Sequence, residues 1–478
     1  MKTEQFSIEN EGDKPLHIAI IGSGSAAFSC AIQAAQRGAT VTIIEADKVI
    51  GGCCVNVGCV PSKILIRAAQ LAQQQRDNPF IGLTNHTPIL NRSQLAMQQH
   101  SRVEELRAAK YQQILDNNPR LHLIKGRAHF KDASTLSVLQ SNGQILEINA
   151  DKFLLATGST PTIPPIDGLA QTPFWTSDDA VFAEASPEHL IIIGSSVIAL
   201  EMAQAYRRLG SQVTLLARHN LLHQEDPLIG EQLQKCFEQE GICIQSFTQV
   251  NKVSFDGKLF NLQTNQGNFS ADKLLLSTGR RANTAGLNLA VAGVDIDEGG
   301  RILVNNRLQS SAPHIFAAGD CCNLPQYVYV AAAAGSRAGI NMTDGDKALD
   351  LSVLPKVIFT DPQVATVGLC EAEAVARGIK IDSRVLAMEN VPRALANFAT
   401  EGFIKLVIDA HTKQLIGAQI VAHEGGEIIQ SAALAIGNKM TVTDLTEQLF
   451  PYLTMVEGLK LCAQTFDKDL KTLSCCAG

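Results

Sequence analysis

Four cysteines in two short runs have the residue type and the spacing for redox or metal chemistry. Cys54 and Cys59 lie five positions apart in GGCCVNVGCVPSK (51–63), which is about one and a half turns of a helix. A disulfide between them would close a small loop and add little stability, so we predict a redox-active pair rather than a structural cross-link. Cys475 and Cys476 are adjacent in LSCCAG at the other end of the sequence. Thiolates are preferred ligands of soft metals, so both runs could also bind a metal ion.

The composition is that of an ordinary globular enzyme. The chain has 478 residues, 45% of them hydrophobic and 18% charged, and this length predicts about two to four domains. A net charge of -7 argues against nucleic acid as a main partner. No secretory signal is visible in MKTEQFSIENEGDKP, and the apolar runs are shorter than the roughly 20 residues of a membrane helix. We therefore expect a soluble, cytoplasmic protein without a membrane partner, whose 12 cysteines are catalytic, metal-binding or core residues.

A strand, helix and strand pattern precedes the first cysteine run. In LHIAIIGSGSAAFSCAIQAAQRGATVTIIE (16–45), a β-branched run passes through glycines into an Ala-rich segment and then a second β-branched run. Gly22 permits a tight turn, Gly24 lets the backbone approach a pyrophosphate at the helix N-terminus, and Ala27 allows close packing. Glu45 is placed to accept hydrogen bonds from a ribose. The pattern favours a dinucleotide site over a purely structural turn.

The same pattern recurs in LIIIGSSVIALEMAQAYRRLGSQVTLLAR (190–218). Gly194 and Ser196 occupy the turn, while Ala217 stands where the first copy has its acidic residue. Loss of that acid removes the repulsion of a 2′-phosphate, and Arg218 can bind the phosphate with paired hydrogen bonds. The second site is therefore predicted to bind NADPH, although Arg218 could also be a plain surface residue.

Two dinucleotide sites in one chain indicate hydride transfer between two cofactors, most simply from NADPH to FAD. FLLATGST (153–160) and LLLSTGRRAN (274–283) each end a hydrophobic strand at Thr-Gly, as expected where the chain crosses between nucleotide domains. HIFAAGDCCN (314–323) ends a strand at an aspartate that could bind the ribityl chain of a flavin or cap the next turn. The residues assigned to the cofactors in these runs are Thr157, Gly158, Gly279 and Asp320.

The motifs GSGSAA, GGCCVNVGCVPSK, ATGS, GSSVIALE and AAGD occur in an order that resembles the flavoprotein pyridine nucleotide disulfide oxidoreductases. This is the family of glutathione reductase and dihydrolipoamide dehydrogenase, and the resemblance runs from about residue 16 to the end. It implies FAD in the first domain, NADPH in the second and a homodimer whose active sites are built from both subunits. It also implies that Cys59 faces the flavin while Cys54 attacks the substrate.

The resemblance also implies a fold. We expect an α/β protein with two Rossmann-like dinucleotide-binding domains and an α+β C-terminal dimerisation domain. The FAD domain would comprise 1–160 and 283–350, the NADPH domain 161–282, and the dimerisation domain with its Cys-Cys tail 351–478. Lys63 would favour a thiolate or reduced-flavin charge, with Glu201 as its ion partner. Further residues assigned to cofactor binding are Gly52, Cys53, Ala128 and Val328; Cys53 stands where the family usually has Thr.

The C-terminal region departs from the disulfide reductases of this family. Those members carry a His-Pro-Thr run whose histidine, oriented by a glutamate, protonates the leaving thiolate. In FPYLTMVEGLK (450–460), Glu457 is present, but Phe450 and Tyr452 occupy the neighbourhood of that histidine, and the last histidine of the chain is His423. Cleavage of a disulfide would therefore lack its general acid. Reduction of a soft metal cation needs thiolate ligands and no proton, so a metal substrate is favoured.

This combination resembles the branch of the family that reduces Hg(II) to elemental mercury. The resemblance rests on CVNVGCVPSK, FPYLTMVEG, ENVPRALANFATEGFIKLV (389–407) and the terminal cysteine pair. It implies that Tyr111 and Tyr452 line the substrate site; otherwise Tyr111 is an amphipathic helix residue and Tyr452 a packed interface aromatic. Members of this branch usually carry an N-terminal heavy-metal-associated domain, for which residues 1–15 are too short. We therefore expect the catalytic core alone, either as a natural core-only form or with that domain removed.

The implied reaction takes electrons from NADPH through FAD and the Cys54/Cys59 pair to Hg(II). Cys475 and Cys476 would collect the ion from small thiols and deliver it to Cys54 and Cys59, so that all four are metal ligands. A reductase of an organic disulfide is the main alternative. A thiol-rich metal-sequestering or redox-sensing protein is a third, although such a protein would not require two dinucleotide sites.

Overall fold

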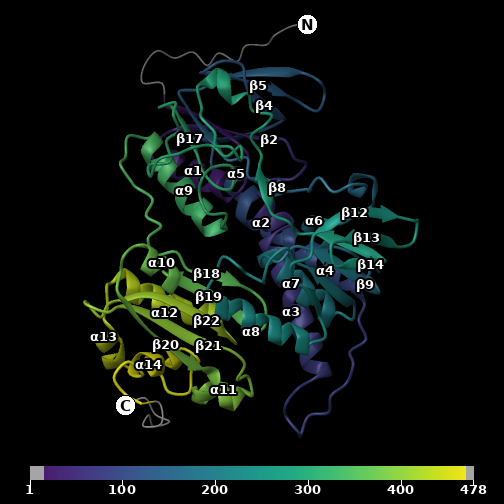
Figure 1. Cartoon of the computed structure of the whole chain (residues 1–478). Coiled ribbons are helices and arrows are strands. Elements are labelled where there is room, and N and C mark those ends of the chain that lie inside the picture. The colour runs from purple at the N-terminus through teal and green to yellow at the C-terminus, as the bar shows by residue number, and fades with distance from the viewer. Residues whose placement is uncertain (1–14, 470–478) are drawn as a thin grey trace. The chain divides into compact units, whose positions relative to one another are not determined.

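The computed structural model describes residues 15–469, and the chain divides into two compact units (Figure 1). Unit 1 consists of the chain up to Ser62 together with Leu95–Thr162 and Gly279–Asp350. Unit 2 consists of Lys63–Gln94, Ile163–Thr278 and the chain from Leu351 onward. Each unit is therefore assembled from segments that are distant in the sequence.

Unit 1 is built around a five-stranded parallel sheet in the order β17-β7-β1-β2-β3. Its central strands are buried on both faces, which explains why they are continuous apolar runs such as HIAII rather than alternating patterns. The strands are β1 (His17–Ile21), β2 (Thr40–Glu45), β3 (Leu121–Lys125), β7 (Lys152–Leu155) and β17 (Ile315–Ala317).

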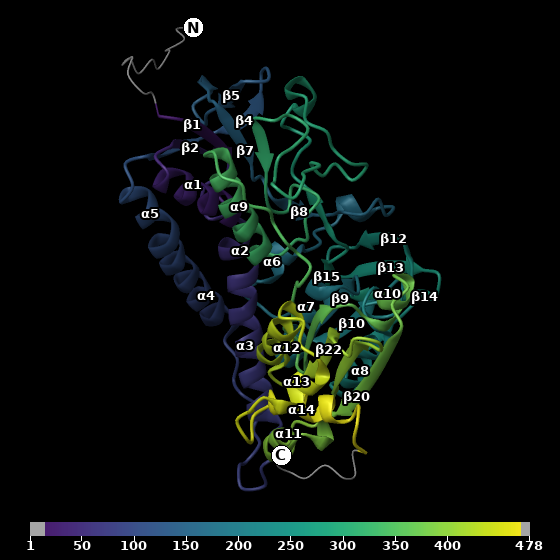
Figure 2. The same ribbon diagram turned by 90° about the vertical axis from the view of Figure 1, so that its left-hand side faces the viewer.

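Helices α1 (Ser25–Gln36) and α9 (Val328–Met342) lie side by side in unit 1 (Figures 1 and 2). A Cβ at Gly335 would lie 2.0 Å from the carbonyl oxygen of Ala26, so glycine permits the close approach. The other elements with most of their residues in unit 1 are α2 (Gly52–Asn56), α4 (Arg92–Arg107), the π-helix η1 (Ala108–Gln112), α5 (Gln113–Asp116), β4 (Arg127–Phe130), β5 (Thr135–Leu139), β6 (Ile145–Asn149), β8 (Ser159–Pro161) and β16 (Arg280–Ala282).

Unit 2 contains a second parallel sheet in the order β11-β10-β9-β15. Helix α8 begins where Asp226 accepts a hydrogen bond from the N–H of Leu228 (3.1 Å) and a proline fills the first helical position. The α-helices and strands of this part are α6 (Ser177–Ala180), β9 (His189–Ile193), α7 (Val197–Arg208), β10 (Gln212–Leu216), α8 (Pro227–Gln239), β11 (Cys243–Gln245), β12 (Val250–Phe255), β13 (Phe260–Thr264), β14 (Gly267–Ala271) and β15 (Lys273–Leu276).

The C-terminal part of unit 2 is an antiparallel sheet in the order β18-β19-β22-β21-β20, with α12 packed on β19 and β22. Buried Ile, Leu, Val and Ala side chains from the sheet and its helices form one core. The elements are β18 (Lys356–Ile358), β19 (Gln363–Gly368), α10 (Glu371–Ala376), β20 (Ile381–Ala387), α11 (Pro392–Asn397), β21 (Phe403–Asp409), β22 (Leu415–Ala422), α12 (Gly425–Gly437), α13 (Val442–Glu447) and α14 (Glu457–Gln464).

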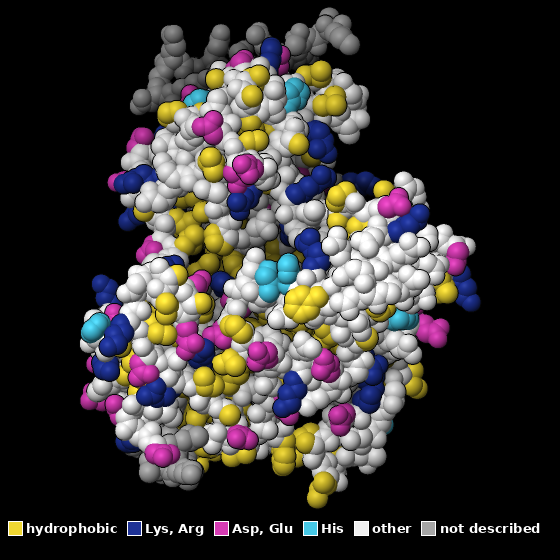
Figure 3. All heavy atoms as spheres, in the orientation of Figure 1, with side chains coloured by type: hydrophobic (Ala, Val, Ile, Leu, Met, Phe, Trp, Pro, Cys, Tyr) yellow, Lys and Arg dark blue, Asp and Glu magenta, His cyan; other side chains and the backbone are white. Residues whose placement is uncertain are grey.

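The predicted α/β class is confirmed, and both predicted strand-helix-strand patterns form as expected. On the face shown in Figure 3, Lys and Arg side chains are interspersed with Asp and Glu. Of the helices in residues 15–469, none is long and apolar enough to cross a membrane.

Candidate active site

The turn between β1 and α1 forms the first candidate cofactor site, in unit 1. Gly22 has a φ of 105°, and a Cβ there would lie 2.2 Å from the carbonyl oxygen of Ala156. Gly24 is the N-cap of α1, so the unpaired backbone N–H groups of the first helical turn begin here. Ala27 is fully buried, which allows α1 to lie close to the sheet. Gly22 and Ala27 therefore have a steric reason for their small size, whereas a Cβ at Gly24 would make only an ordinary contact, 3.7 Å from the Cα of Gly52.

Glu45 ends β2 and is 8% exposed. Its carboxylate accepts hydrogen bonds from the hydroxyl of Ser23 and from the N–H of Asp47 (2.8 Å). Ser23 was not singled out from the sequence, yet it fixes the acid beside the glycine turn. An ionised carboxylate has about four acceptor positions, so Glu45 can also accept hydrogen bonds from ribose hydroxyls.

Gly52 begins α2 and brings that helix against the same turn. A Cβ at Gly52 would lie 2.6 Å from the Cα of Gly24, so the two backbones are in contact. The result is a cradle without side chains, next to a helix N-terminus and a nearly buried acid. This cradle fits the pyrophosphate and ribose of FAD.

Cys54 lies in α2, and Cys59 begins α3 (Cys59–Arg76). The continuous helical spacing expected for the pair is absent, because the N–H groups of Val57 and Gly58 both turn back to the carbonyl of Cys53 (2.9 and 2.7 Å). The two thiols are nevertheless hydrogen bonded to each other. That bond, together with burial and the charges of Cys59 and Cys53, raises the pKa of Cys54 well above its usual range. The two thiols therefore titrate as a pair, and the hydrogen bond favours the form in which they share one proton.

Cys53 is exposed and meets Arg280, whose Nη2 lies 3.5 Å from the cysteine Sγ. The guanidinium also donates to the carbonyl oxygen (2.7 Å) and hydroxyl (2.8 Å) of Ser159. The Ser159 hydroxyl in turn donates to Asp320 (2.8 Å). The predicted flavin residue Asp320 is thus connected to Cys53 through two residues that sequence reasoning missed. Arg280 stood in the quoted run LLLSTGRRAN, but nothing local distinguished it from Arg281.

Tyr111 lies in η1, where a helix makes a local π-type turn of the kind frequent at functional sites. Its ring packs edge-on against Phe28 with a centroid distance of 4.9 Å. Burial raises the pKa of Tyr111, a hydrogen bond from Ser25 opposes that rise, and the charges of Cys54 and Cys59 add to it. Tyr111 is therefore held close enough to the cysteine pair to interact with it electrostatically.

The crossing segments of unit 1 meet around Asn283. The Thr157 hydroxyl donates to the backbone carbonyl of Asn283 (2.7 Å), and the backbone N–H of Asn283 donates to the carbonyl of Gly158 (3.0 Å). The carbonyl of Gly279 accepts a hydrogen bond from the N–H of Thr162 (2.9 Å), so β8 and β16 pair as neighbours. These contacts explain why both Thr-Gly runs end a strand at a turn.

Four further residues of the sequence motifs lie in unit 1. Ala128 is buried in β4, and Val328 is the first residue of α9. Cys321 and Cys322 are both fully buried. A hydrogen bond from Cys322 and N–H groups of the Thr157 segment outweigh burial and lower the pKa of Cys321. Cys321 thus contacts the end of β7 and the segment after it, whereas the Cys322 thiol donates to the carbonyl of Gly319 (3.0 Å) in its own turn.

The turn between β9 and α7 repeats this geometry in unit 2. Gly194 has a φ of 138°, and a Cβ there would lie 2.2 Å from the carbonyl oxygen of Ser277. Ser196 is the N-cap of α7, while Ala217 is fully buried after β10 and Arg218 is exposed. A helix N-terminus flanked by an exposed arginine and no acid at the strand end fits NADPH.

Lys63, in α3, forms the predicted ion pair with Glu201. Lys63 Nζ lies 2.7 Å from Glu201 Oε2, and the glutamate is 4% exposed. Glu201 also accepts a hydrogen bond from the N–H of Phe359 (3.0 Å), whose ring lies 4.7 Å from the ammonium. The lysine, which is 34% exposed, is therefore held in one position within unit 2.

The region that replaces the His-Pro-Thr run lies at the start of α14. Glu457 is 2% exposed and accepts a hydrogen bond from the N–H of Leu453 (3.2 Å), so it stabilises this turn. Tyr452 is 53% exposed in the same turn. Cys475 and Cys476 lie outside the described residues.

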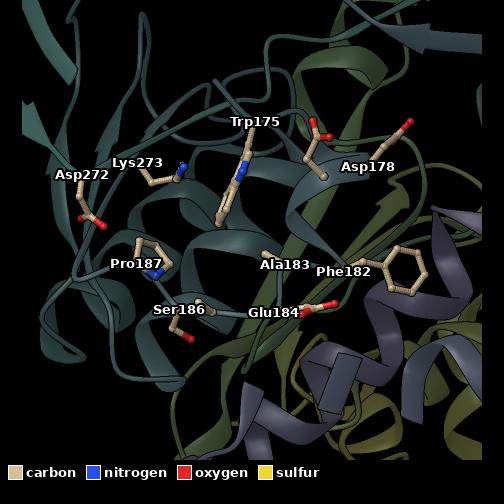
Figure 4. Close-up of a pocket in the computed structure, with 11 residues that line it drawn as sticks. Trp175, Asp178, Phe182, Ala183, Glu184, Ser186, Pro187, Asp272 and Lys273 are labelled. Atoms are coloured by element: carbon tan, nitrogen blue, oxygen red, sulfur yellow. The ribbon is translucent and has the colours of Figure 1, made fainter. Parts of the chain in front are cut away.

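A cavity of ≈ 620 Å³ lies in unit 2 (Figure 4). Its walls include Trp175, with Lys273 Nζ 4.8 Å from the ring centroid, and the acidic residues Asp178 and Glu184. Its lining contains none of the predicted cofactor or cysteine residues. Within residues 15–469, no three His, Cys, Asp or Glu side chains are grouped to hold a resident metal ion.

Comparison with protein families covers most of the chain. Residues 16–335 match the pyridine nucleotide-disulphide oxidoreductases, and residues 354–463 match the dimerisation domain of the same family. The family predicted from the sequence motifs is thereby confirmed, together with its FAD and NADPH cofactors.

Several relatives are similar over nearly the whole chain. The mercuric reductase of Shewanella putrefaciens is 67% identical over 98% of this chain and 84% of its own length. That of Shigella flexneri is 55% identical over 97% and 83%. Among solved structures, the HOCl-induced flavoprotein disulfide reductase RclA from Escherichia coli has a TM-score of 0.84 and 26% identity over 94% of this chain and 99% of its own. The chain therefore belongs to the pyridine nucleotide-disulphide oxidoreductase family, and within that family its similarity is to the mercuric reductases.

Proposed function

We propose that this enzyme reduces Hg(II) to elemental mercury with electrons from NADPH, through FAD and the Cys54/Cys59 pair. The observation that carries the proposal is the hydrogen-bonded thiol pair at the junction of α2 and α3, beside the cradle formed by Gly24 and Gly52. Two soft ligands at that place suit a soft metal ion. The relatives named mercuric reductase support the same substrate.

The cofactor residues are assigned by the two turns. Gly22, Gly24, Gly52, Glu45 and Asp320 would hold FAD. NADPH would be held by Gly194, Ser196 and Arg218 in unit 2, which also contains the ion pair of Lys63 and Glu201. When bound, NADPH and FAD supply the electron pair that the metal receives.

The remaining steps belong to side chains. Hg(II) binds Cys54 and Cys59, and the proton that the two thiols share is released to solvent as the second metal–sulfur bond forms. When the ion takes up two electrons, both metal–sulfur bonds break and the electron pairs stay on the sulfurs. No general acid is required, which is consistent with a sequence in which no histidine follows His423. Tyr111 is placed to orient the ion through its phenol oxygen.

Other assignments extend the proposal to the assembly. Two copies form a homodimer through 351–478, and Tyr452 of one copy completes the site of the other. Cys475 and Cys476 deliver thiol-bound Hg(II). We assign 1–160 with 283–350 to the FAD domain, 161–282 to the NADPH domain and 351–478 to the dimerisation domain. We place the enzyme in the cytoplasm.

Anaerobic NADPH oxidation by the purified holoenzyme tests the substrate. Hg(II) with excess small thiol is expected to support oxidation, whereas oxidised glutathione and lipoamide are not. Cys59→Ser should abolish the Hg(II)-dependent rate because one ligand is lost. Cys243→Ser is a matched control, because that exposed cysteine lies in β11 of unit 2. Oxidation with the disulfides but not with Hg(II) would instead support the organic-disulfide alternative.

The tail assignment has its own test. Replacing both Cys475 and Cys476 by Ala should slow turnover of thiol-bound Hg(II), because the ion must then reach the inner pair directly. Reduction of bound flavin by NADPH should be unchanged, as measured by stopped-flow absorbance. Normal turnover in this variant would reject delivery by the tail.

A further inference from the structure

Cys53 places a third sulfur next to the redox pair. The residue precedes Cys54 in α2 and is exposed. A Cβ built on Gly58 would lie 3.2 Å from the Sγ of Cys53, so this sulfur packs against the glycine that immediately precedes Cys59. Cys53 and Cys54 are consecutive residues of α2. An exposed sulfur therefore lies on the turn that separates the two inner cysteines.

Arg280 holds this sulfur in place. Its Nη2 lies 3.5 Å from Cys53 Sγ, while Nε and Nη2 donate to the hydroxyl and carbonyl of Ser159 (2.8 and 2.7 Å). Ser159 lies in β8, which pairs with the β16 strand that carries Arg280, and its hydroxyl donates to Asp320 (2.8 Å). The guanidinium is thus fixed on its far side by a paired strand, and Cys53 is oriented by a preorganised group.

We propose that Cys53 is a relay ligand for the thiol-bound soft metal ion, taking it up beside Cys54 and Cys59 and passing it to them. This inference rests on the proposed function and names a residue in the path of its substrate. Arg280 is a positioning residue in this step. Sulfur is the property that matters, because a soft ion prefers thiolate to hydroxyl ligands.

Each step of the relay is a ligand exchange without electron transfer. A bond forms between the metal and the Cys53 sulfur, a bond to one carrier thiolate breaks, and the proton from Cys53 passes to the departing thiolate. Cys54 then displaces the second carrier thiolate, which leaves with the proton of the Cys54/Cys59 pair. Cys59 displaces Cys53, which regains a proton from solvent. Cys53 thus acts in succession with the inner pair and is released once Cys59 has bound the ion.

The test follows metal arrival rather than turnover. Holoenzyme carrying Cys475→Ala and Cys476→Ala is reduced with one equivalent of NADPH, desalted, and mixed with one equivalent of Hg(II) bound to glutathione. Samples are quenched with iodoacetamide at increasing times, and protection of each cysteine is measured by peptide mass spectrometry. We expect protection of Cys53 to rise first and to fall as Cys54 and Cys59 become protected.

Two variants test the sulfur of Cys53 and its contact with Arg280 separately. Cys53→Ser keeps a small hydrogen-bond acceptor and should slow protection of the inner pair about tenfold or more, and Arg280→Met should slow it about tenfold. Cys243→Ser should load at the parental rate. Inner-pair protection at the parental rate in Cys53→Ser would overturn the relay. Failure of the proposed function is a different result, namely no Hg(II)-dependent NADPH oxidation by the unmodified enzyme.

Discussion

The two strand-helix-strand motifs of this chain share one backbone feature, a turn glycine that lies close to a carbonyl oxygen of a neighbouring segment. In unit 1 a Cβ at Gly22 would lie 2.2 Å from the carbonyl oxygen of Ala156, and in unit 2 a Cβ at Gly194 would lie 2.2 Å from that of Ser277. In both cases the glycine follows the central strand and its turn touches the next strand of the sheet. The close approach is therefore a property of the motif and not of one cofactor.

A side-chain contact is repeated as well. The His17 ring lies 2.9 Å from the Thr42 hydroxyl, and the His189 ring lies 2.9 Å from the Thr214 hydroxyl. Each pair ties the first strand of its motif to the second. The backbone N–H of each histidine also donates to a carboxylate, His17 to Asp151 (2.7 Å) and His189 to Asp272 (2.6 Å).

The motifs differ at the end of the second strand. Glu45 is fixed there by Ser23 in unit 1, whereas unit 2 has the buried Ala217 followed by the exposed Arg218. The glycine turn positions a pyrophosphate in either motif, and the strand end determines which ribose substituent is accepted. Two strand-helix-strand motifs with the same backbone can thus bind different dinucleotides because two or three side chains differ.

Replacing the turn glycines should have the largest effect and should separate the two sites. Gly22→Ala is strained at positive φ and meets the Ala156 carbonyl, so unit 1 should lose about 3 kcal/mol or more and the protein should retain little FAD. Gly194→Ala should preserve flavin content but lose reduction by NADPH. Flavin absorbance per chain and anaerobic NADPH titration measure the two effects.

Gly38 and Gly210 provide matched controls. They have φ values of 94° and 100°, and no atom lies within 4 Å of a Cβ built on either. Alanine at these positions should cost about 1–2 kcal/mol from backbone strain alone, without loss of cofactor. If Gly38→Ala lost FAD as completely as Gly22→Ala, the close approach to Ala156 would not be the cause.

Local patterns predicted the frames of both motifs, because a buried parallel strand, a glycine turn and an amphipathic helix leave a signature within about 30 residues. The cysteine pair was also visible as a spacing. The spacing alone did not show that the two cysteines belong to different helices, since the chain turns between α2 and α3 at Val57 and Gly58. Gly58 was the available signal, because a glycine between two helical runs indicates a possible break.

Residues that act across the fold could not be predicted in this way. Arg280 lies 227 positions from Cys53 and 121 from Ser159, so no sequence window contains the contacts that give it a role. Ser23 contacts Glu45 from 22 positions away, and any small residue would have satisfied the glycine motif there. Neighbours of this kind are set by strand order and crossover, which place distant strand ends at one edge of a sheet.

Exchanging the strand-end residues should produce the next largest effect. Arg218→Ala should raise the KM for NADPH about ten- to a hundredfold and leave NADH nearly unchanged, because a charge-assisted pair to the 2′-phosphate is lost. Adding Ala217→Glu should shift preference to NADH, since Ser195 follows Gly194 as Ser23 follows Gly22 and could fix the new acid. The ratio of kcat/KM for the two coenzymes is the measurement. An unchanged ratio in Arg218→Ala would make Arg218 a plain surface residue.

The smallest expected effect is the loss of the histidine–threonine contact. It tests whether the contact contributes equally to the stability of the two motifs. Thr42 and Thr214 are 7% and 6% exposed, so loss of either ring leaves a nearly buried hydroxyl and should cost about 1 kcal/mol. His17 also contacts the carbonyl of Asn149 (2.9 Å), so single replacements would not compare equal interactions. A double-mutant cycle of His17→Ala with Thr42→Val isolates one contact, and His189→Ala with Thr214→Val isolates the other. Urea unfolding should give equal coupling energies, because the two contacts have the same length and nearly the same burial. A His–Thr coupling energy found in one motif and absent from the other would show that this contact is not part of what the two motifs share, which would then be their backbone geometry.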